Sequence, residues 1–344
     1  MTPERLQSLV DQFSSRRIAV IGDFFLDKYL DTDPTIVETS VETGKPAHQV
    51  TAVRHSPGAA GTVVNNLAAL GVKNLYAVGA VGNDGEAFDL ISDLQSLGCS
   101  TDGLLQFDSL MTPTYLKPRD GSTAGLAGEF ERYDTRNRKP TPAEVSQAVL
   151  NFLEGLLPDL DAIIIADQVV ESDWGIITES VRQKLSAWAS EHPTVVFWAD
   201  SRTHIRDFQN IIIKPNQFEA VAHQNPVPGE ETSVEQLNSA LPELRKSMNA
   251  PVCITLGEKG TLVSDPEPTH VPGIKLDGPL DTTGAGDSVT AGAVATLSAG
   301  ATLPEAALIG NLVASITVQQ LDTTGSATPE QLVDRLEVWR EQNL

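Results

Sequence analysis

Short, almost wholly apolar runs alternate with helix-like segments along most of this chain, and no other feature restricts its fold as strongly. The runs cover residues 17–21, 74–78, 162–166, 195–199, 211–214 and 252–256. Helical patterns lie between them at residues 62–70, 86–97, 141–156, 174–190 and 234–246. Strands too apolar to have a solvated face are typical of a mainly parallel sheet with helices on both faces. The sequence therefore predicts an α/β fold. Threonine-proline pairs at 141–142 and 328–329 predict helix starts capped by the threonine.

Two stretches, residues 24–56 and 104–138, interrupt this alternation. Both are rich in Thr, Val, Pro and charged residues, and neither contains a helical pattern. Patches of period-two alternation favour strands in both stretches. We expect them to pair into a small separate sheet over one edge of the core. This sheet would be a lid inserted in a single domain that covers residues 1–344.

The charge of the chain excludes several classes of partner. Its 344 residues include 24 Lys and Arg against 46 Asp and Glu, a formal net charge of −22. Such a chain lacks the basic stripe that binds polyphosphate backbones or anionic lipids, so we expect neither nucleic acid nor membrane binding. No segment reaches the roughly 18 uninterrupted apolar residues of a membrane span, and the amino terminus lacks a signal-peptide pattern. We expect a cytoplasmic protein.

Residues 281–287 (DTTGAGD) come directly before a small-residue segment with a helical pattern. Its glycines permit a tight turn whose backbone N–H groups converge at the positive end of the helix, where anions bind. Asp287 would follow in the first turn, placed to take a proton from a hydroxyl that attacks a bound phosphate. Taken alone, the same string is also a flexible turn with an aspartate cap.

Two further segments bear on phosphate chemistry. In residues 214–219 (KPNQFE), Asn216 and Glu219 would share one face at the start of a helix. That pair could hold a hydrated Mg²⁺, or it could be a capping pair. Residues 252–260 read as a strand followed by a turn between Gly257 and Gly260. This turn could lie against a nucleotide, or it could be a plain hairpin.

Polar residues also follow the first apolar run. Asp23 comes at its carboxyl end, where open α/β sheets place their ligands, and Asp27 lies four residues further on. Residues 57–62 (PGAAGT) introduce a helix that carries Asn66. Asp23, Asp27, Thr62 and an asparagine would supply the paired acceptors and donors that a polyhydroxylated substrate needs. The alternative is that the two aspartates are turn and cap residues.

Together these segments resemble the ribokinase-like carbohydrate kinases of the pfkB family over nearly the whole chain. GD near the first strand, GxxGxxG after the second, KPNxxE, TLGxxG and DTTGAGD occur in the family's order. Within the family, GDFFLDKY, the Pro57–Gly58 segment and the region of Glu42 are most similar to the kinase half of the bifunctional heptose-7-phosphate kinase/heptose-1-phosphate adenylyltransferases. We expect no adenylyltransferase domain after residue 344.

The resemblance implies a three-layer αβα core and a β-sheet lid that often forms a dimer interface, hence a homodimer. It implies transfer of the ATP γ-phosphoryl group to a hydroxyl of a sugar or sugar phosphate, with a heptose phosphate favoured. It also implies Mg²⁺ and, in many members, potassium. Asp287 would be the catalytic base, with amides of Gly284, Ala285 and Gly286 around the anion. Asn216 and Glu219 would order Mg²⁺ through water, and Asp281 and Thr283 fall where the monovalent cation binds.

Binding residues follow from the same resemblance. Those implied for the nucleotide are Lys214, Asn216, Thr255, Gly257, Gly260 and Asn311. Those implied for the acceptor sugar are Asp23, Asp27, Gly58, Thr62 and Asn66, with Lys117, Arg119 and Arg132 as candidates for a phosphate already on the sugar. The three cations could equally be ordinary solvated charges of the lid.

The sequence departs from the heptose kinases at the sugar end. Where they read PGGAAN, residues 57–62 have Ala59 for the second glycine and Thr62 for the asparagine. A hydroxyl in place of an amide changes the available hydrogen bonds, so the sugar could differ. Another kinase of the family, for ribose, fructose or a nucleoside, and a non-catalytic ligand-sensing relative therefore stay open. The glycine spacing at residues 79–85 does not fit a dinucleotide-binding oxidoreductase.

Overall fold

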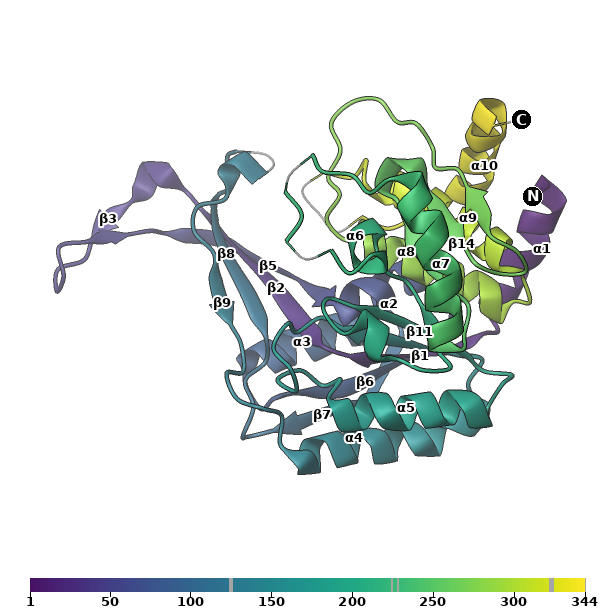
Figure 1. Cartoon of the computed structure of the whole chain (residues 1–344). Helices are drawn as coiled ribbons and strands as arrows, with labels where there is room; N and C mark the ends of the chain where they lie inside the picture. Colours follow the sequence, from purple (N-terminus) through teal and green to yellow (C-terminus); the bar gives the residue numbers. More distant parts are fainter. Residues whose placement is uncertain (124–125, 224, 228, 322–324, 344) are drawn as a thin grey trace.

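A six-stranded parallel sheet lies at the centre of the computed structural model, which describes residues 1–123, 126–223, 225–227, 229–321 and 325–343 (Figure 1). Its strands, in spatial order, are β12 (Ile212–Ile213), β11 (Val196–Ser201), β10 (Ala162–Asp167), β1 (Arg17–Gly22), β6 (Asn74–Gly82) and β7 (Cys99–Phe107). Every neighbouring pair is parallel. The predicted α/β class is confirmed.

Helices cover both faces of this sheet. One face carries α1 (Pro3–Phe13), α2 (Ala60–Ala69), α3 (Gly85–Ser96), α8 (Ala285–Ser298), α9 (Leu303–Thr317) and α10 (Pro329–Asn343). The other carries α4 (Ala143–Leu156), α5 (Glu179–Glu191) and α7 (Val234–Met248). The central strand alternates between them, because Ile18 and Val20 enter one apolar core while Ala19 and Ile21 enter the other. This gives the predicted three layers.

A four-stranded sheet stands apart from the core. Its order is β5 (Val50–Ala59), β2 (Phe24–Thr32), β8 (Thr114–Asp120) and β9 (Tyr133–Thr135), and β3 (Glu38–Thr39) pairs with β4 (Pro46–Ala47) beyond it. In Figure 1, β2 and β5 run out from the core and carry β3 at their far end. We refer to β2, β5, β8 and β9 as the lid. The predicted boundary at residue 104 falls inside β7, so residues 104–107 belong to the core sheet.

A small antiparallel sheet of β13 (Cys253–Thr255), β14 (Thr261–Val263) and β15 (Thr269–Val271) extends the core beyond β12. Isolated parallel bridges join Ile213 to Val252 and Asn216 to Thr255. The turn between β13 and β14 is therefore a hairpin, and Gly260 within it has φ +92°. No helix in the described part of the chain is long and apolar enough to cross a membrane.

The two predicted threonine caps have different outcomes. Thr328 caps α10, where its amide donates to Gln331 Oε1 at 2.9 Å and its Oγ1 accepts from the Gln331 amide at 3.5 Å. The prediction for Thr141 is wrong, because Pro142 precedes α4 without a side-chain cap. Thr141 Oγ1 instead donates to the Gly175 carbonyl at 2.8 Å. The hydroxyl is thus used to hold the segment between β10 and α5.

Ala59 has a backbone conformation that suits glycine, with φ +54° and ψ −117° directly before α2. Non-glycine residues in such regions cost about 1–3 kcal/mol. We expect Ala59→Gly to raise the free energy of unfolding by about 1 kcal/mol, after the extra entropy of glycine in the unfolded chain is subtracted. Urea unfolding followed by circular dichroism measures the change. Ala68→Gly, inside α2, is the control and should lower the free energy of unfolding by about 1 kcal/mol. A similar decrease for Ala59→Gly would contradict the claim that the Ala59 backbone is strained.

Candidate active site

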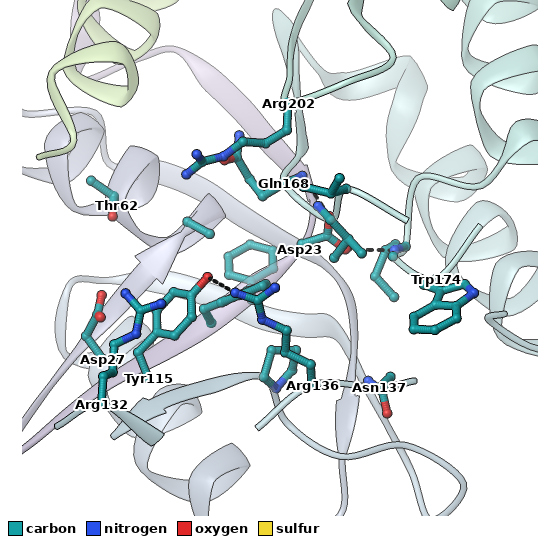
Figure 2. Close-up of a pocket in the computed structure, with 18 of the residues that line it drawn as sticks. Asp23, Asp27, Thr62, Tyr115, Arg132, Arg136, Asn137, Gln168, Trp174 and Arg202 are labelled. Atoms are coloured by element: carbon teal, nitrogen blue, oxygen red, sulfur yellow. Dashed lines mark hydrogen bonds between the residues drawn. The ribbon is translucent and has the colours of Figure 1, made fainter. Parts of the chain in front are cut away.

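A cavity of about 450 Å³ is lined by residues of both the lid and the core. It is bounded by β2 and β8 of the lid, by residues on either side of β9, by residues 168–176 after β10, and by the loop that leads into α8. Figure 2 shows side chains from the lid and from the segment after β10 around it, among them Tyr115, Arg132, Gln168 and Trp174. The carboxyl ends of β1 and β10 lie at its floor, which is the ligand position expected for an open parallel sheet.

The start of α8 faces this cavity. Asp281, Thr283, Gly284 and Asp287 line it, and Gly284 turns the chain into the helix with φ +75°. The Ala285 amide differs from its predicted role, because it donates to the Thr282 carbonyl at 3.1 Å and closes the turn. The amides of Gly284, Gly286 and Asp287 have no partner among the described residues. Three free donors thus remain at the positive end of the helix.

The Asp287 carboxyl group lies in an environment that favours its protonated form. Burial raises its pKa to about 7, the nearby Asp200 adds to the rise, and Lys214 and Arg202 oppose it. Lys214 Nζ lies 2.8 Å from Asp200 Oδ2. A Cβ built on Gly286 would stand 3.3 Å from that nitrogen, so the ion pair lies beside the first turn of α8. A carboxyl group with this pKa can both hold and release a proton near neutral pH.

Asn216 and Glu219 form the capping pair that the sequence left open. At the start of α6 (Gln217–Ala220), Asn216 Oδ1 accepts from the amides of Phe218 and Glu219 at 2.9 and 3.0 Å, and Glu219 Oε2 accepts from the Asn216 amide at 2.8 Å. Glu219 Oε1 and Asn216 Nδ2 have no protein partner in the described residues. Burial raises the pKa of Glu219, and Asp200 adds to this. A cation held through water fits this oxygen, whereas no described cluster of three His, Cys, Asp or Glu could bind a metal directly.

The residues predicted for the nucleotide gather around the small β13–β15 sheet rather than the cavity. Thr255 bridges to Asn216 and pairs with Thr261, and Gly257 and Gly260 flank the hairpin turn. The Asn311 amide nitrogen is engaged, because it donates to the Val271 carbonyl at 3.2 Å. Lys214 is buried in its ion pair. Neither these residues nor Glu219, Ala285 and Gly286 line the cavity.

The two aspartates predicted for the sugar have different surroundings. Asp23 is 3% exposed, and its carboxylate accepts three backbone N–H groups of residues 168–176. Asp27 lies 2.8 Å from Lys117 Nζ and faces the cavity. Gly58 contacts it from β5, where a Cβ would come within 2.5 Å of Asp27 Oδ2. Gly58 thus makes room for the Asp27 carboxylate instead of lining the cavity itself.

Thr62 and Asn66, which were also predicted to bind the sugar, lie in different surroundings. Thr62 lines the cavity from the first turn of α2. The expectation for Asn66 is corrected, because this side chain is 0% exposed and lies away from the cavity. Its Nδ2 donates to the Thr62 carbonyl at 3.0 Å, and its Oδ1 accepts from Ser288 Oγ at 3.4 Å. One turn of helix therefore directs Asn66 toward α8.

Cations gather on the lid side of the cavity. Arg132 and Arg136 both contact Asp134, at 2.7 and 3.2 Å, and both lie against the Tyr115 ring (Figure 2). Arg119 lines the cavity too, but it is buried and donates to the Thr123 carbonyl at 2.7 Å. Seven further polar or aromatic lining residues were not predicted from the sequence: Tyr115, Arg136, Asn137, Arg138, Gln168, Trp174 and Arg202. The density of Arg and Lys at 132–139 could have indicated Arg136 and Arg138, but whether these side chains face the cavity depends on the path of the chain through β9.

Comparison with known proteins agrees with this architecture. The family model described as pfkB family carbohydrate kinase matches residues 15–331. The bifunctional protein HldE of Desulfatibacillum aliphaticivorans is 29% identical over 336 residues, which are 96% of this chain and 65% of that protein. HldE of Shewanella amazonensis is 30% identical over 318 residues, 91% of this chain and 62% of that protein. The chain thus spans less than two thirds of the length of these relatives.

Solved structures show the same fold at lower identity. Ribokinase of Arabidopsis thaliana complexed with ribose and ATP superposes with a TM-score of 0.66 at 18% identity, over 94% of this chain and 99% of that one. Phosphofructokinase-2 of Escherichia coli in complex with substrates and products gives 0.65 at 20% identity, over 94% and 99%. With the family model covering nearly the whole sequence, this chain belongs to the pfkB family of carbohydrate kinases.

Proposed function

We propose that this protein transfers the γ-phosphoryl group of ATP to a hydroxyl of a sugar phosphate, and that a heptose phosphate is the favoured acceptor. One observation carries the proposal. Asp287 and the unpartnered amides of Gly284 and Asp287, at the start of α8, share a cavity with a cluster of lid cations. Such a cavity offers a base and an anion site at one end and a site for an acidic group at the other.

The residues around the cavity suggest how the acceptor would react. Asp27 and Thr62 would bind sugar hydroxyls, and Asp287 would accept the proton of the attacking hydroxyl. The amides of Gly284 and Gly286 would stabilise charge on the phosphoryl oxygens. Closure of the lid would exclude water, so that the base does not promote hydrolysis of ATP.

The nucleotide and the cations would occupy the neighbouring surface. ATP would lie near Thr255, Gly257, Gly260 and Asn311, which the small antiparallel sheet and α9 bring together. Mg²⁺, held through water by Asn216 and Glu219, would neutralise charge on the nucleotide phosphates. The loop before α8 is our candidate for potassium, since Asp281 and Thr283 lie together there, with the Thr283 amide 2.9 Å from Asp281 Oδ1.

Exposed apolar side chains on and next to the lid support a homodimer formed through it. Val53 lies in β5 and Tyr133 in β9, whereas Val41 lies between β3 and β4 and Phe130 precedes β9. Val41, Val53, Phe130 and Tyr133 are 96%, 52%, 52% and 55% exposed. Pairing of two lids would remove these apolar side chains from water. We place the enzyme in the cytoplasm, where ATP is available.

A kinase for another sugar is the second candidate. Thr62 lines the cavity with a hydroxyl where the heptose kinases have an amide, and this favours a different set of acceptor hydroxyls. A panel assay that follows ADP release separates the two. We expect kcat/KM at least about 100-fold higher for a heptose, hexose or pentose phosphate than for the matching free sugar. A free sugar or a nucleoside as the best acceptor would favour the second candidate, and no ADP release with any acceptor would favour a non-catalytic relative.

The pH dependence of the reaction follows from the environment of Asp287. Its pKa of about 7 lies above the ordinary 3.8, so the carboxyl group is protonated at pH 5 and ionised at pH 8. Because a base must be ionised to accept a proton, we expect kcat/KM to rise with pH and to reach half its plateau near pH 7. Initial rates between pH 5 and 9 test this. An ascending limb centred below pH 5 would contradict the assignment.

A further inference from the structure

Residues 168–176, which we call the acceptor wall, connect β10 to α5 without a helix or strand of their own. Gln168, Trp174 and Ile176 of this segment line the cavity. Backbone amides in such a segment must find partners outside regular secondary structure. What holds the acceptor wall in place therefore also shapes one side of the cavity.

The Asp23 carboxylate supplies those partners. Its Oδ2 accepts from the Gln168 amide at 2.8 Å and from the Val169 amide at 3.2 Å, and its Oδ1 accepts from the Ile176 amide at 2.7 Å. The Asp23 backbone is fixed as well, because its amide donates to the Ala166 carbonyl and its carbonyl accepts from Ala60, each at 3.1 Å. Asp23 thus joins β1, the acceptor wall and the start of α2.

The acceptor wall in turn holds a cation of the cavity. Gln168 Oε1 accepts from Arg202 Nε at 3.1 Å, and the Arg202 amide donates to the Asp167 carbonyl at 3.0 Å. Figure 2 shows Gln168 beside Asp23 with Arg202 above it. Burial raises the pKa of the carboxyl groups of Asp287 and Glu219, and the Arg202 guanidinium opposes that rise at both. Arg202 therefore lies within electrostatic reach of both carboxyl groups.

We propose that Asp23 is a positioning residue, which acts through Gln168 on Arg202 and so fixes both the acceptor wall and the positive charge beside Asp287. This inference rests on the proposed function of the same cavity. It departs from the role of a direct sugar ligand that the sequence suggested for Asp23. Asp27, whose carboxylate faces the cavity from β2, would then bind the sugar hydroxyls in place of Asp23.

Two variants disturb this arrangement in different ways. Asp23→Asn keeps the size of the side chain but places an N–H group against amides that need an acceptor. Gly175→Ala keeps the Asp23 carboxylate and pushes on it, because the new Cβ would stand 2.7 Å from Asp23 Oδ1 and 3.0 Å from Oδ2. Gly155→Ala in α4 is the matched control, since Gly155 is exposed and its Cβ would meet no atom within 4 Å.

Hydrogen exchange and kinetics together test the proposal. We expect both variants, but not the control, to lose amide protection at residues 168–176. We also expect acceptor kcat/KM to fall about tenfold or more, with KM for ATP unchanged within about twofold. The midpoint of the ascending limb of the pH profile should move up by about 0.5 pH unit, because release of Arg202 removes a positive charge that lowers the pKa of Asp287. The other charged groups near Asp287, namely Asp200 and Lys214, are not altered. Arg202→Gln should shift the limb alike, with no further shift when combined with Gly175→Ala.

The results that would contradict this role of Asp23 can be told apart. If Asp23→Asn weakens acceptor binding while Gly175→Ala does not, Asp23 is a direct sugar ligand and the proposal fails. Loss of protection without any change in the pH limb would reduce Asp23 to a purely structural role. Hydrogen exchange needs no turnover, so an inactive wild-type protein would overturn the proposed function while the contact between Asp23 and the acceptor wall is still tested.

Discussion

We expect replacement of Asp287 by asparagine to lower kcat by about 10³–10⁴-fold and to leave the Kd for ATP within about twofold of the wild-type value. Asparagine has the same size and can still accept a hydrogen bond, but it cannot take a proton from the acceptor hydroxyl. The first turn of α8 keeps its free amides, because they come from the backbone. The loss therefore falls on the chemical step and not on binding.

Asp277→Asn is the matched control for this variant. Asp277 lies in the same connection before α8, is exposed and does not line the cavity. It should keep wild-type kcat, since an exposed charge outside the cavity is largely screened by salt. Isothermal titration with a non-hydrolysable ATP analogue gives the Kd, and ADP release gives kcat. An Asp287→Asn enzyme within about tenfold of wild type would remove Asp287 from the role of base.

The second large effect concerns the two guanidinium groups beside Tyr115. We expect the double substitution of Arg132 and Arg136 by alanine to lower kcat/KM for a sugar phosphate by about 10²–10⁴-fold. Each charge-assisted hydrogen bond to a phosphate contributes about 1.5–3 kcal/mol, and the lid provides both groups within reach of the shared Asp134. The matching free sugar should lose less than about threefold, because it has no group for them to bind.

Arg245→Ala provides the comparison for charge removal. Arg245 pairs with Asp265 at 2.8 Å and does not line the cavity. Its kinetics should match wild type for every acceptor. If the double arginine variant loses sugar phosphate and free sugar equally, the two arginines shape the lid and do not recognise a phosphate.

The sequence predicted the core of the fold well because its strands are buried on both faces. Residues 162–166 must be apolar at every position, so the run is visible without knowledge of its neighbours. The strand β7 was missed for the opposite reason. It lies at the edge of the sheet, where polar residues such as Thr101 and Asp102 are tolerated.

The candidate site was most directly predictable where its residues are close in sequence, although Asp27, Thr62, Lys117, Arg119 and Arg132 were also predicted and line the cavity. Asp281, Thr283, Gly284 and Asp287 form one turn, and all four line the cavity. The role of Asp23 depends on amides about 150 positions away, which no local pattern connects to it. Asn66 was misplaced because a single helical turn decides between the cavity and α8. Long-range contacts of this kind are set by tertiary packing.

A single labelling experiment tests the central claim most directly. The protein is incubated with ATP labelled at the γ-phosphorus, Mg²⁺ and a heptose 7-phosphate or another sugar phosphate, and the products are separated. We predict label in a sugar bisphosphate, in equal amount to the ADP formed, with a rate about 10³–10⁴-fold lower for Asp287→Asn. Label found only as inorganic phosphate, or retained in ATP with every sugar phosphate offered, would contradict phosphoryl transfer at this cavity.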